Sequence, residues 1–255
     1  MKRIIKYVII DILKNKTLLV YTILLGLLTW SVFSMEDNTT KGLLTLLSVI
    51  LITVPLVSIV FSTIYIYNSA EFIELLMSQP IRRNKIYLSL FTGLAFAMVL
   101  AFLLGAGIPL LIFSFDYTGI TMILAGCAIT MVFVSLAFLI SVFTRDKSKG
   151  IGVAIILWLY FSLLFDGLVL FILFQFSEYP IEKAMIAISA FSPVDLVRII
   201  ILLQLDVSVM MGYTGAIFKD FFGTKSGMLI TIVLIALWII IPFWVSIVKF
   251  KKKDL

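Results

Sequence analysis

The chain has 255 residues, of which 62% are hydrophobic and 13% charged, with a formal net charge of +6. A soluble globular domain is nearer half apolar and a quarter charged, so this composition indicates an integral membrane protein. The sequence contains no histidine and a single cysteine, Cys127, which excludes HExxH zinc proteases, serine–histidine dyads, histidine proton relays and an internal disulfide.

Residues 1–16 predict an amphipathic helix that lies in the inner membrane interface. Its basic residues alternate with aliphatic residues at helical spacing, which turns the basic side toward anionic headgroups. The same pattern is typical of a secretory signal peptide. No small-x-small cleavage site follows Leu18–Phe33, however, and the apolar core is long, so we expect the helix to be retained.

The remaining chain is dominated by apolar runs that are continuous for about 20 residues and do not alternate with period two. This pattern predicts helices and not a β-barrel. Six spans are expected, at about 17–35, 43–67, 86–115, 118–143, 150–175 and 226–248, each long enough to cross a bilayer. The predicted fold is therefore all-α: one polytopic membrane domain over residues 1–255, with short cytoplasmic and outer-face helices between the spans.

The basic residues gather on one side of the predicted membrane domain. Fifteen of the 20 Lys and Arg residues fall in the N-terminal helix, the 68–85 loop, the 144–149 loop and the C-terminal tail. The positive-inside rule then places both termini in the cytoplasm. We attribute the high isoelectric point to this orientation and expect no nucleic-acid binding.

The segment Glu71–Ser89 (EFIELLMSQPIRRNKIYLS) is unusual because it combines acids, a proline and basic residues between two long spans. A short helix is predicted, with Phe72, Leu75, Leu76 and Gln79 on one face and Glu71, Glu74 and Ser78 on the other. Pro80 ends the helix, and Arg82–Lys85 anchors the next span at the headgroups. The residues alone leave two interpretations open: a plain interfacial helix, or a coupling helix that docks into a soluble motor.

Residues 176–225 form the longest predicted outer segment. In Phe191–Leu205, Ser192 is placed to cap a helix, Pro193 falls at its first position, and Asp195 and Arg198 are i,i+3 neighbours on its surface. We expect this helix at the outer interface. The following residues, 207–223, fit a re-entrant, interfacial or short spanning segment, although a full span would move the basic tail outside.

Asp166 is the one acid that lies clearly inside a predicted span. It could serve a proton or ion relay, or it could be a hydrogen-bonded packing residue, and the lack of a second ionisable residue in the spans favours packing. The pair Met210–Met211 could suggest copper binding, but adjacent helical residues point to different sides, so no metal site is predicted. Gly223–Ser226 lacks the rest of a phosphate-binding loop, so no nucleotide or other cofactor is expected in this chain.

The basic amphipathic start, the six spans and one element between the second and third spans resemble the permease subunits of type-2 ABC transporters over the whole chain. The element is Glu74-Leu75-Leu76-Met77-Ser78-Gln79-Pro80-Ile81-Arg82-Arg83. The outer segment Phe191–Gly223 is more specifically similar to NosY-type permeases, which serve nitrous oxide reductase maturation. Ser192 stands in place of the Asn that usually precedes the proline of that pattern.

This resemblance implies a homodimer in the bacterial inner membrane, a cytoplasmic ATPase subunit that binds ATP and Mg, and a periplasmic β-helix protein on the outer face. The resemblance implies no catalysis by this chain. The complex would serve assembly of a copper–sulfur centre. It would do so by moving a sulfur species or copper, or by transmitting force alone. The residues implied for ATPase coupling are Glu71, Glu74, Leu75, Gln79, Pro80, Arg82 and Arg83, and those implied for periplasmic docking are Asp195, Arg198, Tyr213 and Phe218. The alternatives are a generic ABC-2 exporter permease for a lipid, drug or ion, a proton-coupled carrier that depends on Asp166, and an intramembrane enzyme.

Overall fold

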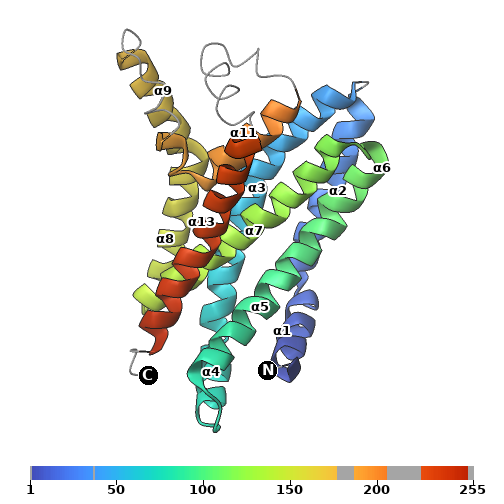
Figure 1. Ribbon diagram of the computed structural model, residues 1–255. Coiled ribbons are helices and arrows are strands. Elements are labelled where there is room, and N and C mark those ends of the chain that lie inside the picture. Colours follow the sequence, from blue (N-terminus) through green and yellow to red (C-terminus); the bar gives the residue numbers. More distant parts are fainter. Residues whose placement is uncertain (1, 37, 177–186, 206–224, 252–255) are drawn as a thin grey trace.

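The computed structural model describes residues 2–36, 38–176, 187–205 and 225–251, which contain helices and no strand (Figure 1). In chain order the elements are α1 (Lys2–Leu13), α2 (Lys16–Met35), α3 (Thr39–Asn68), α4 (Ala70–Met77), α5 (Arg83–Phe102), the π-helix η1 (Leu103–Gly107), α6 (Ile108–Phe113), α7 (Tyr117–Phe143), α8 (Lys147–Leu159), the π-helix η2 (Tyr160–Leu164), α9 (Phe165–Gln175), α11 (Pro193–Gln204) and α13 (Lys225–Lys251).

Six of the helical stretches are long and apolar enough to cross a membrane, which confirms the predicted all-α fold with six spans. They are Lys16–Met35, Thr39–Asn68, Arg83–Phe113, Tyr117–Phe143, Lys147–Ile172 and Gly227–Lys251. The beginning of α1 and the end of α13 lie at the same end of the bundle, next to α4 (Figure 1). The six spans found among the described residues agree with this arrangement; which side of the membrane it faces stays a prediction from the basic residues.

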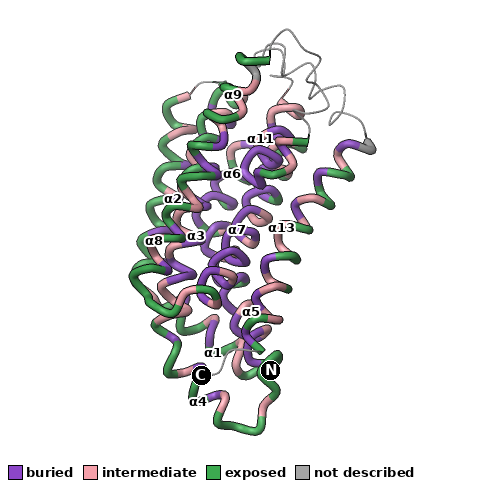
Figure 2. The backbone as a smooth tube through the Cα atoms, turned by 90° about the vertical axis from the view of Figure 1, so that its left-hand side faces the viewer, coloured by how far each residue is buried: buried purple, intermediate pink, exposed green. Residues whose placement is uncertain are grey.

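The core of the bundle is centred on α7. In the apolar 18-residue stretch of α7, 72% of the residues are buried. The corresponding share is 17% in the span that contains α8 and α9 and in the span formed by α13. In Figure 2 the buried backbone follows α7 and its neighbours α3 and α5. Small residues permit this close packing: a Cβ added at Gly126 would lie 2.1 Å from the buried ring of Phe102 on α5.

Two of the predicted spans are interrupted by π-helical turns, which the sequence patterns do not predict. At η1, the backbone of Gly105 lies against α2, so that an added Cβ would meet the Thr22 carbonyl oxygen at 2.9 Å. At η2, the π-turn ends two residues before Asp166, in the middle of the fifth span. Such turns insert one residue into the helical ladder and redirect the side chains that follow.

The amphipathic helix predicted at the N-terminus is α1. It buries Val8 and Ile12 against α5, where Gly93 leaves room for Val8, while Lys2, Arg3 and Lys6 are exposed. The Tyr65 hydroxyl of α3 donates a hydrogen bond to Asp11 at 3.0 Å. The helix is thus fixed to the bundle by its apolar side and keeps its basic side free for the headgroups.

The outer helix α11 is more buried than a helix that lies on a membrane surface. Eight of its residues, Pro193–Val197 and Ile199–Ile201, are buried, and it packs against α7, α13 and α3. It lies at the end of the bundle opposite both termini (Figure 1). Its Val and Ile side chains lie on nearly every side of the helix and pack against the neighbouring spans; that α11 lies at the outer interface stays a prediction.

Candidate functional site

The helix α4 projects beyond the spans at the same end of the molecule as the two termini (Figure 1). Ser69 is its N-cap residue, and at its other end the Ser78 hydroxyl donates a hydrogen bond to the Leu75 carbonyl at 2.9 Å. Pro80 follows the helix end by three residues, as expected of a residue that cannot continue a helix. The structure thus has a short helix before Pro80, as predicted, but the helix ends at Met77 and Gln79 lies beyond it.

The short helix α4 has one buried and one exposed side. Ile73 and Leu76 are buried, whereas Leu75 is 67% exposed and lies on the outer side with Glu71 and Glu74. Leu75 and Leu76, predicted to share one face, therefore differ in burial, because α4 packs against α3 and α5 from the side that carries Ile73 and Leu76. The exposed side consequently presents an apolar residue between two carboxylates.

The position of α4 is also fixed by α1. The rings of Phe72 on α4 and Tyr7 on α1 stack with centroids 5.1 Å apart. Gln79, Pro80, Arg82 and Arg83 continue the exposed surface into the turn before α5. All seven residues predicted for ATPase coupling thus lie on one exposed surface at one end of the bundle.

At the opposite end, the structure joins two sites that the sequence analysis treats as separate. Arg198 on α11 forms an ion pair with Asp166 on α9 at 2.7 Å and a second with Asp195 on its own helix at 3.1 Å. The Ser192 hydroxyl accepts a hydrogen bond from the Asp195 backbone N–H at 3.2 Å, which confirms the predicted cap. We call Asp166, Asp195 and Arg198 the outer ion-pair cluster.

The charges in this cluster do not balance, because one guanidinium faces two carboxylates. Burial raises the pKa of Asp195 to about 7; Arg198 opposes this shift, and the nearby Asp166 adds to it. Burial works against the charged form of Arg198, but its hydrogen bond to Asp166 and the charges of both carboxylates outweigh burial and raise the pKa of Arg198. The carboxyl of Asp195 can therefore take up a proton near neutral pH.

Asp166 now has a cationic partner, which agrees with the packing interpretation of this residue. Helical periodicity could not reveal the partner, since Arg198 is 32 residues away and lies outside the spans. Tyr213, Phe218 and the pair Met210–Met211 lie outside the described residues. Within the described part of the chain, no group of three or more acidic, Cys or His side chains is placed to hold a metal ion.

Comparison with known proteins identifies the chain's family. The family model described as ABC-2 family transporter protein matches residues 4–255. The chain belongs to the ABC-2 transporter family. As an ABC-2 permease it is a multi-pass membrane-transport subunit.

A relative of this ABC-2 permease is a probable ABC transporter permease protein NosY from Pseudomonas aeruginosa. The two are 30% identical over 152 residues. The match covers 54% of this chain and 54% of that protein, so it spans about half of each.

Proposed function

We propose that this ABC-2 permease is of the NosY type and works in the inner membrane of a bacterium, in maturation of the copper–sulfur centre of nitrous oxide reductase. The proposal is supported by the similarity to a probable NosY permease over about half of the chain. The motif similarity in Phe191–Gly223 adds to that support. In this role a partner subunit binds ATP and Mg and hydrolyses the nucleotide.

We propose that α4 is the coupling helix. Its exposed side combines Leu75 with Glu71 and Glu74, an arrangement that can place an apolar side chain in a groove while the carboxylates select basic residues at the rim. Packing against α3 and α5 and ring stacking on α1 hold the helix from behind. A force applied to α4 can therefore reach two spans and the interfacial helix directly.

At the outer end, we propose that α11 and the residues after it receive a periplasmic β-helix protein. The side chain of Arg198 is 28% exposed and can contact the partner. The side chain of Asp195 is 10% exposed and contributes by holding Arg198 in place. A second copy of the chain is proposed to cover part of the large apolar surface left by α2, α8–α9 and α13.

A pull-down from mild detergent tests the proposal. The tagged wild-type chain should recover an ATPase subunit and a periplasmic β-helix protein. Glu74→Arg should lose the ATPase and still insert into the membrane, and Pro80→Ala should weaken its recovery. Asp146→Arg, a charge reversal on an exposed residue at the same end, serves as the control and should retain the ATPase. If both Glu74→Arg and Pro80→Ala recover the ATPase at the wild-type level, α4 is not the coupling helix.

The outer end is tested in the same assay. Arg198→Glu should reduce recovery of the periplasmic protein and leave ATPase recovery unchanged. Loss of the ATPase alone would place the outer segment on the wrong side of the membrane. A wild-type chain that recovers the ATPase but no periplasmic β-helix protein favours the alternative, a generic ABC-2 exporter permease.

A further inference from the structure

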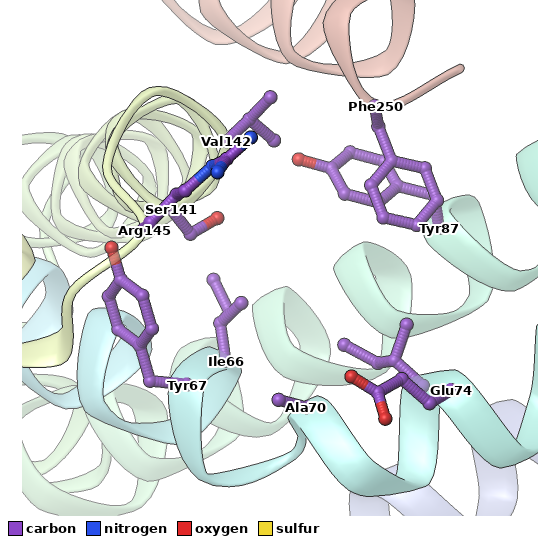
Figure 3. A pocket seen from close by; sticks show the side chains of 10 residues that line it. Ile66, Tyr67, Ala70, Glu74, Tyr87, Ser141, Val142, Arg145 and Phe250 are labelled. Atoms are coloured by element: carbon purple, nitrogen blue, oxygen red, sulfur yellow. The ribbon is translucent and has the colours of Figure 1, made fainter. Parts of the chain in front are cut away.

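A pocket of about 300 Å³ lies behind α4, at the end of the bundle that carries the termini (Figure 3). It is formed where α3, α4, α5, α7 and α13 meet, and of its lining residues only Glu74 is used in the functions above. Its lining residues are Ile66, Tyr67, Ala70, Ile73, Glu74, Tyr87, Ser141, Val142, Arg145 and Phe250. Its volume is at the lower end of the range for small-molecule sites, roughly 300–1,000 Å³.

The floor of the pocket is aromatic and fixed in place. The rings of Tyr87 and Phe250 stack with centroids 4.4 Å apart, and both residues are buried. The Tyr67 hydroxyl donates a hydrogen bond to the Thr144 carbonyl at 3.0 Å, and Gly150 lies directly against the Tyr67 ring. These packed rings give the pocket a rigid apolar floor.

The rim carries two exposed charges of opposite sign, Glu74 and Arg145, which reach the pocket from opposite sides (Figure 3). Within the described part of the chain, neither side chain forms an ion pair or a hydrogen bond. An occupant that is negative at one end and positive at the other would complement both charges at once.

We propose that this pocket binds the headgroup of a zwitterionic phospholipid with a primary ammonium, a phosphoethanolamine lipid. Its phosphate pairs with Arg145, and its ammonium pairs with Glu74 beside the aromatic floor. The positive-inside count places this end of the bundle at the inner leaflet, where pockets between transmembrane helices can bind lipid headgroups. A choline headgroup has no N–H to donate to Glu74, and a glycerol headgroup has no cation, so both should bind more weakly.

The site goes beyond the proposed coupling function, although it shares one wall with it. Ala70, Ile73 and Glu74 belong to α4, so a bound headgroup would bridge α4 to Arg145 at the end of α7. The lipid would then restrain the helix proposed to transmit force from the ATPase.

Native mass spectrometry of the full chain, exchanged into an equimolar mixture of phosphatidylethanolamine, phosphatidylcholine and phosphatidylglycerol, tests the site. The wild-type chain should retain one phosphatidylethanolamine molecule. It should prefer this lipid to phosphatidylcholine about tenfold, because one charge-assisted hydrogen bond changes affinity by about that factor. Glu74→Gln should remove this preference, and Arg145→Gln should lower retention of all three lipids. The controls are Glu71→Gln on the same helix and Lys149→Gln after the same span, neither of which lines the pocket.

Equal retention of the three lipids by the wild-type chain would overturn the proposal, as would variants that behave like their controls. Soluble phosphoethanolamine that competes as well as the lipid would show that the ligand is a small molecule and not a lipid. A direct ion pair between Glu74 and Arg145 would also overturn the proposal. In that case both variants should lose the same thermal stability in the absence of lipid, and the double exchange Glu74→Arg with Arg145→Glu should restore it. Since lipid retention needs no ATPase, its failure is distinguishable from failure of the coupling proposal.

Discussion

Arg198 connects two carboxylates that come from different parts of the chain. Its guanidinium lies 2.7 Å from Asp166 and 3.1 Å from Asp195, and all three side chains are at most one-third exposed. Removing one partner of such a pair leaves a partly buried charge unpaired, which costs more than the pair itself contributes. The cluster is therefore the place where single polar substitutions should affect stability most clearly.

Substitution of Asp195 should change how stability depends on pH. Its pKa is about 7 in the folded chain and about 3.9 when unfolded, so the folded state binds more protons between these values. The contribution of Asp195 to stability is thus greatest at low pH and is lost as pH rises toward 7. In thermal unfolding in detergent, the midpoint temperature of the wild-type chain should decrease as the pH is raised from 5.5 to 8. Asp195→Asn should abolish that decrease. Asp116→Asn, an exposed acid, should keep it; a fall that persists in Asp195→Asn contradicts the assignment.

Arg198→Gln leaves the two carboxylates without a cation and should destabilise the chain by about 2 kcal/mol, less than for a fully buried pair because the site is partly exposed. The second substitution Asp166→Asn should recover part of this loss, since it removes one of the unpaired charges. Chemical or thermal unfolding of the single and double variants measures both effects. Additive losses would mean that the two residues do not interact.

At the scale of elements, the π-helix η1 and the close approach of α2 belong together. Gly105 in η1 faces the α2 backbone, and an added Cβ would also lie 3.2 Å from Leu25. A helix–helix contact between apolar surfaces in a membrane depends on such close packing, because lipid tails are as apolar as the side chains.

Gly105→Ala should therefore destabilise the chain by about 1–3 kcal/mol, since backbone atoms cannot move aside as a flexible side chain can. Gly152 in α8 is the matched control, because a Cβ there meets nothing within 4 Å. Gly152→Ala should be neutral or stabilise by up to about 1 kcal/mol through helix propensity. Thermal unfolding in detergent compares the two variants, and equal midpoints would show that η1 is not tightly packed.

At the scale of the whole molecule, the ends of the bundle differ in charge and in exposed groups. One end carries α4, the pocket with Glu74 and Arg145, and most of the basic residues; the other carries α11 and the outer ion-pair cluster. Between them, α7 is the buried spine against which α3, α5, α11 and α13 pack. A displacement at either end can pass to the other through this spine.

The orientation can be measured by cysteine labelling in a Cys127→Ala background. A membrane-impermeant thiol reagent should label Asn38→Cys and Asp116→Cys from outside the cell. It should label Ser78→Cys and Lys149→Cys only after permeabilisation, because these exposed positions lie at the basic end. The reverse pattern would invert the proposed topology and remove α4 from the cytoplasm.

The features that depend only on neighbouring residues could be predicted from the amino-acid sequence. The six spans follow from continuous hydropathy, and the start of α11 follows from Ser192 and Pro193. Only the tertiary structure decided which side of the short helix α4 is buried, since that depends on the positions of α1, α3 and α5. It also decided that Asp166 meets Arg198 and that Glu74 faces Arg145 across a pocket, because these pairs join residues far apart in the chain, where local periodicity carries no information.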